Sequence, residues 1–95
     1  MDKSSRFRRN PDFIFREIVG ESVLVPTGKA SRQFPGVGTM NRTGAFLWEL
    51  LEQERSLKEL SELFAAEYGL TEEQSQQDVT EFLEAAQSHD AVLLC

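Results

Sequence analysis

Apolar and polar positions change period once along the chain, from strand-like in the first half to helical in the second. Two short runs rich in aromatic and β-branched residues, Phe13–Val19 and Ser22–Val25, predict two strands. The Gly20-Glu21 step between them predicts a tight hairpin, with Gly20 at the first central position, where φ is positive. Pro26 has no backbone N–H to donate and is expected to close the second strand.

A third strand is predicted just before the helical half of the chain. The stretch Thr27 to Gly36 consists mostly of loop-forming residues, and Val37–Met40 then forms a short apolar run. Asn41 is expected to cap the following helix by accepting a backbone N–H bond. The apolar stripe of this helix, with Trp48 to its side, consists of Phe46, Leu47, Leu50 and Leu51.

Two further helices each begin with a capping signal. Ser56 and Glu59 form the spacing of a capping box, and Gly69 is expected to end that helix. A second such box, Thr71 to Gln74, starts the last helix, which is expected to fray near Ser88-His89-Asp90. The predicted buried stripes are Leu57, Leu60, Leu63 and Phe64 in one helix, and Val79, Phe82, Leu83 and Ala86 in the other.

Strands followed by helices predict an α+β domain. We expect residues 13–95 to form a single domain in which three helices cover one face of a small three-stranded antiparallel sheet. Residues 1–12 are basic and contain a single large apolar side chain, Phe7, so we interpret them as a flexible arm. Ala91–Leu94 is left open as a final short strand or a packed tail.

Charge is divided unevenly over the 95 residues, which carry a net charge of −6. Residues 1–51 hold eight Lys/Arg and five Asp/Glu, whereas residues 52–95 hold two Lys/Arg and eleven Asp/Glu. The acidic half would repel a phosphate backbone, which argues against nucleic-acid binding. Two readings of this acidity stay open: an ordinary solvated helix surface, or a surface that selects a basic partner.

The residue types needed for catalysis or metal binding are scarce. The chain has one His and one Cys, so neither a zinc site nor a nucleophilic triad is expected, and no cofactor is implied. His89 is interpreted as a polar residue near a helix end, and Cys95 has no neighbour in sequence that would activate it. No apolar run is long enough for a membrane span, and no secretory signal is recognised, so a cytoplasmic location is expected.

A binding function is more compatible with the pattern than an enzymatic one. A small sheet has exposed edges, and an open edge can accept a partner peptide as an added strand. Val37, Gly38, Thr39 and Met40 form the best candidate edge because this strand is short, uncharged and contains a glycine. If the last helix packs beside it, Val79, Phe82 and Leu83 are predicted to form a groove wall; the alternative is that they are ordinary core residues.

Several segments in order resemble the PqqD family. They include Val23-Leu24-Val25, the corner Met40-Asn41-Arg42-Thr43-Gly44 with Trp48-Glu49-Leu50-Leu51, and Asp78-Val79-Thr80-Glu81-Phe82-Leu83. The helix from Leu57-Lys58-Glu59-Leu60 through Glu67-Tyr68-Gly69 also matches, so the resemblance covers about residues 13 to 94. It implies a small winged-helix-like fold.

The resemblance also implies a function and partners. Members of this family act as peptide chaperones, or recognition elements, for ribosomally made and modified peptides. A precursor's leader segment would pair with Val37 to Met40, contact Val79, Phe82 and Leu83, and be presented to a modifying enzyme, often a radical S-adenosylmethionine protein. In the founding pathway the product is pyrroloquinoline quinone. The stretch Thr27 to Gly36 is longer and more polar than expected for that pathway, which favours the broader stand-alone group.

Two other functions are weighed against the peptide chaperone. A winged-helix DNA-binding regulator would need a basic recognition helix, yet the last two helices carry only Lys58. A structural subunit would use the same open edge to form a homodimer.

Overall fold

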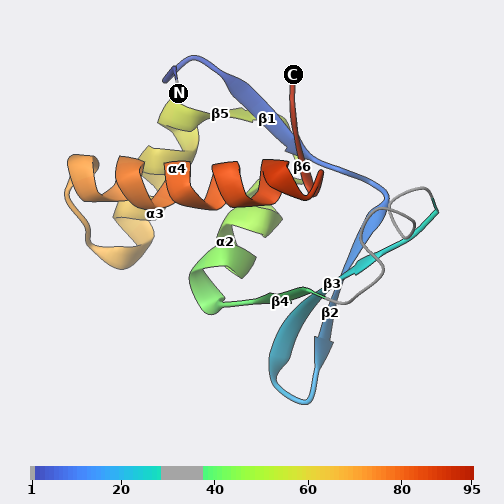
Figure 1. Ribbon diagram of the computed structural model, residues 1–95. Coiled ribbons are helices and arrows are strands. Elements are labelled where there is room, and N and C mark those ends of the chain that lie inside the picture. Colours follow the sequence, from blue (N-terminus) through green and yellow to red (C-terminus); the bar gives the residue numbers. More distant parts are fainter. Residues whose placement is uncertain (1, 29–37) are drawn as a thin grey trace.

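A computed structural model describes residues 2–28 and 38–95, which fold as two small antiparallel sheets and three helices (Figure 1). The predicted α+β class is confirmed, with a three-stranded sheet followed by three helices. The strands are β1 (Arg6–Arg9), β2 (Phe13–Ile18), β3 (Glu21–Pro26), β4 (Gly38–Met40), β5 (Arg55–Ser56) and β6 (Val92–Leu94). The helices are α2 (Arg42–Leu50), α3 (Leu57–Tyr68) and α4 (Glu72–Ser88).

The main sheet has the strand order β2-β3-β4 and contains all three predicted strands. The β2–β3 hairpin closes at the pair Ile18 and Glu21, so its loop is Val19-Gly20, one residue earlier than predicted. Both loop residues have positive φ, 49° for Val19 and 81° for Gly20, as a type I′ turn requires. Gly20 therefore has the predicted positive φ but occupies the second central position.

A hydrogen bond at the open end of the hairpin shows which residues of β3 direct their backbone groups toward β2. The N–H of Thr27 donates to the carbonyl of Asp12 at 2.7 Å, next to the last registered pair of the two strands. In an antiparallel strand, successive residues direct their backbone groups to opposite edges. Odd-numbered residues of β3 therefore face β2, and even-numbered residues face β4.

A second sheet, of order β5-β1-β6, joins the two ends of the chain. Phe7 pairs with Arg55 on one side and with Leu94 on the other. Its side chain is 1% exposed and belongs to the core. Residues 6–9 therefore differ from the flexible arm expected over residues 1–12, because Phe7 fills a core site and both edges of β1 find partners. The open question about Ala91–Leu94 resolves as a strand, β6.

The helices begin and end near the predicted residues. Asn41 accepts the Gly44 N–H at 2.8 Å, and Ser56 with Glu59 forms the complete capping box. Thr71 accepts the Gln74 N–H, which is one half of the second predicted box. Gly69 ends α3 in the left-handed conformation, with φ 63°.

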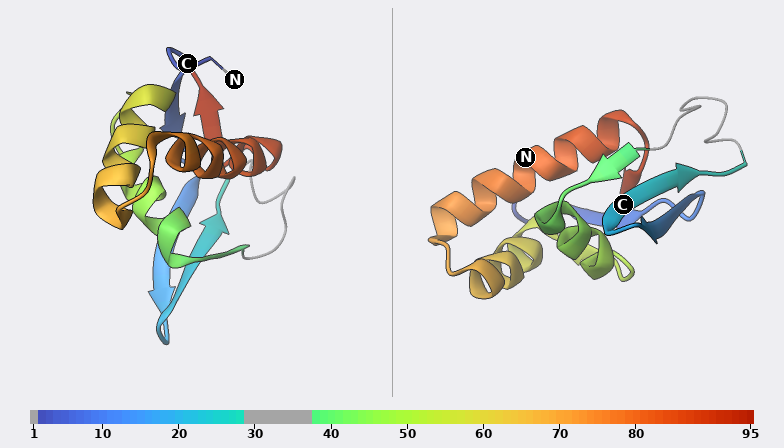
Figure 2. Two further views of the ribbon diagram at one scale, coloured as in Figure 1. Left: turned by 90° about the vertical axis from the view of Figure 1, so that its left-hand side faces the viewer. Right: turned by 90° about the horizontal axis from the view of Figure 1, so that it is seen from below.

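One core is shared by the strands and helices. It includes Phe7, Phe13 and Leu24 from the strands, and Trp48 and Leu60 from the helices. Leu63, predicted to be buried, is instead 39% exposed. Figure 2 shows α4 crossing over α2 and α3 on one side, while the β2–β3 hairpin projects away from the helices.

Candidate functional site

The outer edge of β4 is the open edge predicted from the sequence. Ser22 of β3 pairs with Met40, and Leu24 pairs with Gly38. Since even-numbered residues of β3 face β4, Gly38 and Met40 direct their backbone groups toward β3. The N–H and C=O of Thr39 therefore point to the opposite edge, where no described strand pairs with β4. An incoming strand would find one donor and one acceptor there.

The middle of helix α4 lies across a hollow from the end of this edge. The view from below projects β4 between β3 and α4 (right-hand panel of Figure 2), and Figure 1 shows that α4 lies at a higher level than β4. A hollow of about 370 Å³ begins where β4 ends, at Asn41, and extends between the N-terminal turn of α2 and the middle of α4. Leu47, Phe64 and Phe82 give it an apolar lining, and Asp78 and Glu81 border it with carboxylates.

The residues predicted for the α4 wall are placed differently from one another. Phe82 is half-buried and lines the hollow, whereas Val79 and Leu83 are 0% exposed and belong to the core. All three share one helical face, but only the residue at its margin reaches the hollow. Val79 and Leu83 do not line the hollow. Gly38, Thr39 and Met40 form β4, and Val37 lies outside the described residues.

Only Phe82 of the eight residues that line the hollow was predicted as a site residue, and the missed ones include Leu47, Phe64, Asp78 and Glu81. Leu47 and Phe64 had been interpreted purely as core residues of their own helices. Asp78 and Glu81 had been grouped with the solvated charges of α4, although they precede Phe82 by four positions and one position. Helical spacing from Phe82 is the signal that would have found Asp78, and Glu81 is in turn three positions from Asp78.

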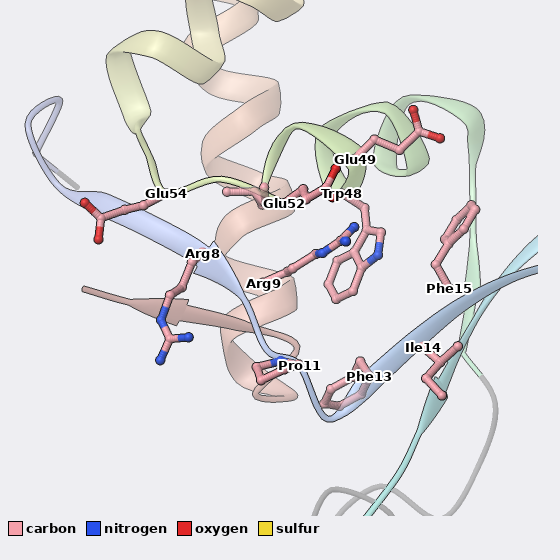
Figure 3. Close-up of a pocket in the computed structure, with 11 residues that line it drawn as sticks. Arg8, Arg9, Pro11, Phe13, Ile14, Phe15, Trp48, Glu49, Glu52 and Glu54 are labelled. Carbon is pink, nitrogen blue, oxygen red and sulfur yellow. The ribbon is translucent and has the colours of Figure 1, made fainter.

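A second, larger hollow of about 740 Å³ lies at the opposite edge of the main sheet, between β1, β2 and α2 (Figure 3). Phe13 and Phe15 of β2 approach it from one side and Trp48 of α2 from the other. The guanidinium carbon of Arg9 lies 5.7 Å from the centroid of the Trp48 ring, within range of a cation–π contact. Because this contact and the core burial of Trp48 account for the site, we assign it a packing role.

Chemical groups for catalysis are sparse in the described part of the chain. No group of three or more His, Cys, Asp or Glu side chains there is arranged to hold a metal ion. His89 lies at the C-terminal cap of α4, and its N–H donates to the Ala86 carbonyl. Desolvation, followed by a hydrogen bond with Glu54, raises the pKa of the Cys95 thiol, which disfavours the reactive thiolate.

No helix among the described residues has the length and apolar character needed to cross a bilayer.

Comparisons with known proteins agree with the resemblance noted in the sequence. The model of the family described as Coenzyme PQQ synthesis protein D (PqqD) matches residues 21–92. Among solved structures, a chain described as TbiB1 in complex with the TbiA(beta) leader peptide superposes with a TM-score of 0.73. The match covers 90% of this chain and 93% of that chain at 21% sequence identity, so it supports the fold. No curated protein matches the chain.

Proposed function

This chain belongs to the PqqD family, and on that premise we propose that it is a non-catalytic peptide-binding protein. Its ligand is the leader segment of a ribosomally made precursor peptide. The leader adds as a strand to the outer edge of β4 and lies against α4. The chain then presents the bound precursor to a modifying enzyme.

One observation carries the proposal: the outer edge of β4 ends beside a hollow on α4 that has an apolar floor and a polar rim. The outward N–H and C=O of Thr39 supply main-chain hydrogen bonds that do not depend on the peptide's sequence. The hollow at Leu47, Phe64 and Phe82 supplies a side-chain subsite. Backbone pairing combined with a side-chain pocket is the general mode by which sheet edges recognise extended peptides. A protein of similar fold, TbiB1, is described in complex with a leader peptide, which supports a leader peptide as the class of ligand.

The proposed enzyme partner and product rest on the family resemblance. We propose a radical S-adenosylmethionine enzyme or another peptide-modifying enzyme as the partner, with both proteins in the cytoplasm. The product would be pyrroloquinoline quinone or a related peptide-derived compound. The chain itself needs no cofactor for this role, because presenting a peptide requires only binding.

A DNA-binding role is disfavoured by charge. Helices α3 and α4 together carry a single basic side chain, Lys58, among many carboxylates. A recognition helix in a DNA groove depends on Lys and Arg contacts with phosphates. If the chain instead formed a homodimer through its β4 edge, a mass measurement in solution would detect the dimer. A leader peptide would then compete with dimer formation.

The proposal is tested by removing one backbone donor. Thr39→Pro eliminates the outward N–H, and an edge strand tolerates proline where that N–H faces solvent. We expect Thr39→Pro to weaken binding of the leader encoded beside this chain by about tenfold or more, because it also places a pyrrolidine ring at the pairing edge. Isothermal titration calorimetry measures the affinity.

Thr39→Ala is the matched control, since it shortens the same side chain and keeps the N–H. Thr39→Ala should bind the leader nearly as well as the wild type. Equal affinity of Thr39→Pro and Thr39→Ala, with both proteins folded, would reject strand addition at β4.

A further inference from the structure

The face of α4 that borders the hollow is acidic. Helix α4 carries five carboxylates and no lysine or arginine. Two of them, Asp78 and Glu81, border the apolar hollow beside Phe82. Glu81 also borders a neighbouring shallow hollow of about 320 Å³ together with Glu73, so the carboxylates continue along the helix.

These two carboxylates lie close together and lack a cationic partner among the described residues. Asp78 and Glu81 are three positions apart on one helix, where side chains are neighbours and like charges repel. Both are exposed, and neither forms an ion pair with a described residue; the described ion pairs all involve Arg6 or Arg55, far from α4 in the sequence. Repulsion between the two carboxylates is unfavourable in the free protein, and a cation placed between them would relieve it.

We propose that Asp78 and Glu81 select leader peptides that carry a lysine or arginine next to an apolar anchor. This inference rests on the proposed strand addition at β4 and names the class of peptide that the site takes. The apolar side chain occupies the hollow over Leu47, Phe64 and Phe82. The cationic side chain lies between the two carboxylates.

The spacing of these two leader residues follows from strand geometry. Alternate side chains of an added strand face the same side, so positions two apart both face α4. Residues one position apart would face opposite sides of the sheet. The leader therefore presents an apolar residue and a basic residue separated by one position of free choice.

The surrounding charges favour this assignment. The nearest basic residue along the chain from the open edge is Arg42, at the start of α2. It lines a different hollow, on the hairpin side, together with Glu17 and Glu21. A cation entering beside α4 thus meets Asp78 and Glu81 from the helix and no described basic side chain that lines the same hollow.

The double variant Asp78→Asn/Glu81→Gln tests the proposal, with the adjacent precursor's leader as the probe. Fluorescence anisotropy would compare the wild type, the double variant and Glu84→Gln, which removes a charge from α4 outside the hollow. We expect the double variant to bind about 3- to 10-fold more weakly, as two exposed ion pairs would predict. Glu84→Gln should bind like the wild type.

Two further measurements, the salt dependence of binding and the melting temperature, separate an effect on peptide recognition from an effect on folding. Raising the salt concentration should weaken wild-type binding and leave the double variant nearly unchanged. The melting temperature of the double variant should equal or exceed that of the wild type, because a like-charge pair has been removed.

The outcomes distinguish this inference from the proposed function. If the wild type and the double variant bind the leader equally, the leader still binds but the charge selection is overturned. If replacing each Lys and Arg of the leader in turn by Gln leaves the affinity unchanged, the inference is likewise overturned. If the wild type does not bind the leader at all, the proposed function fails, and this inference fails with it.

Discussion

At the scale of single residues, backbone direction decides more than side-chain chemistry. Thr39 matters because its N–H and C=O point away from β3, a consequence of strand register and not of its hydroxyl group. Val19 matters because it has a φ of 49° in the hairpin loop, a conformation that a β-branched residue rarely adopts. Its side chain is 99% exposed, so no packing compensates for the strain.

Val19→Asn should therefore stabilise the protein. Asparagine tolerates the left-handed region, and Asn-Gly is a preferred sequence for a type I′ turn. We expect the free energy of unfolding to rise by about 1 kcal/mol, since the left-handed conformation costs a non-glycine residue roughly 1–2 kcal/mol. Urea denaturation measures the difference. A variant no more stable than the wild type would contradict the strain assigned to Val19.

At the scale of elements, the sequence predicted the helix starts best. Asn41, Ser56 and Thr71 each cap a helix as expected, because capping depends on residues three positions apart that the sequence displays directly. The hairpin was predicted one residue too late, since Val19 was counted as a strand residue from its β propensity. Val19 instead lies in the turn, because the register of β2 with β3 ends at the pair Ile18 and Glu21.

The strand of the proposed binding edge was predictable as an element, but the hollow beside it was not. Gly38, Thr39 and Met40 form the predicted strand, and Phe82 lies in the predicted wall. Val79 and Leu83 are fully buried, because helical periodicity identifies an apolar face without showing how much of it α2 and α3 cover. Leu47 and Phe64 reach the hollow from two other helices, a juxtaposition that depends on tertiary packing.

The Ser56–Glu59 capping box links stability to pH. The hydrogen bond from the Ser56 backbone N–H, with smaller effects from the Ser56 hydroxyl and Arg6, holds the pKa of Glu59 below its ordinary value. As the pH falls, Glu59 is therefore protonated at a higher pH in the unfolded chain than in the folded protein. The stabilisation is present above the ordinary carboxylate pKa, about 4.3, and is lost as pH falls through the lower folded value.

Glu59→Gln should flatten this dependence. The wild type is expected to lose stability more steeply than the variant as pH falls below about 4.3. Thermal unfolding followed by circular dichroism between neutral and acidic pH measures both curves. Glu62→Gln, on the exposed surface of the same helix, is the control and should follow the wild-type curve. Parallel curves for Glu59→Gln and the wild type would remove the capping box as a source of pH dependence.

At the scale of the whole molecule, β1 joins the two ends of the chain. It pairs with β5, which precedes α3, and with β6, which follows α4. The carbonyls of Lys3 and Ser5 also accept the first backbone N–H groups of α3, from Lys58 and Leu57. These contacts span most of the sequence, so no local pattern predicted them. A segment with one aromatic residue among arginines looks like an arm until its partners are known.

Phe7→Ala tests whether β1 is integral to the fold. Removing a fully buried aromatic side chain should cost about 3–5 kcal/mol, a large part of the stability of a small domain. Arg8→Ala, whose exposed side chain lies on the same strand, should change the free energy of unfolding by less than about 0.5 kcal/mol. Chemical denaturation measures both. If Phe7→Ala were as mild as Arg8→Ala, the N-terminal segment would behave as the flexible arm.

The central claim is that a leader peptide pairs with β4 beside α4, and amide NMR tests it most directly. Isotope-labelled protein would be titrated with the leader encoded beside it. We expect chemical-shift changes to concentrate at Gly38–Met40 and at residues 78–83, with slowed amide exchange at Thr39. Changes concentrated instead at β2 and α2, around Phe15 and Trp48, or no changes in the folded protein at saturating peptide, would contradict the account.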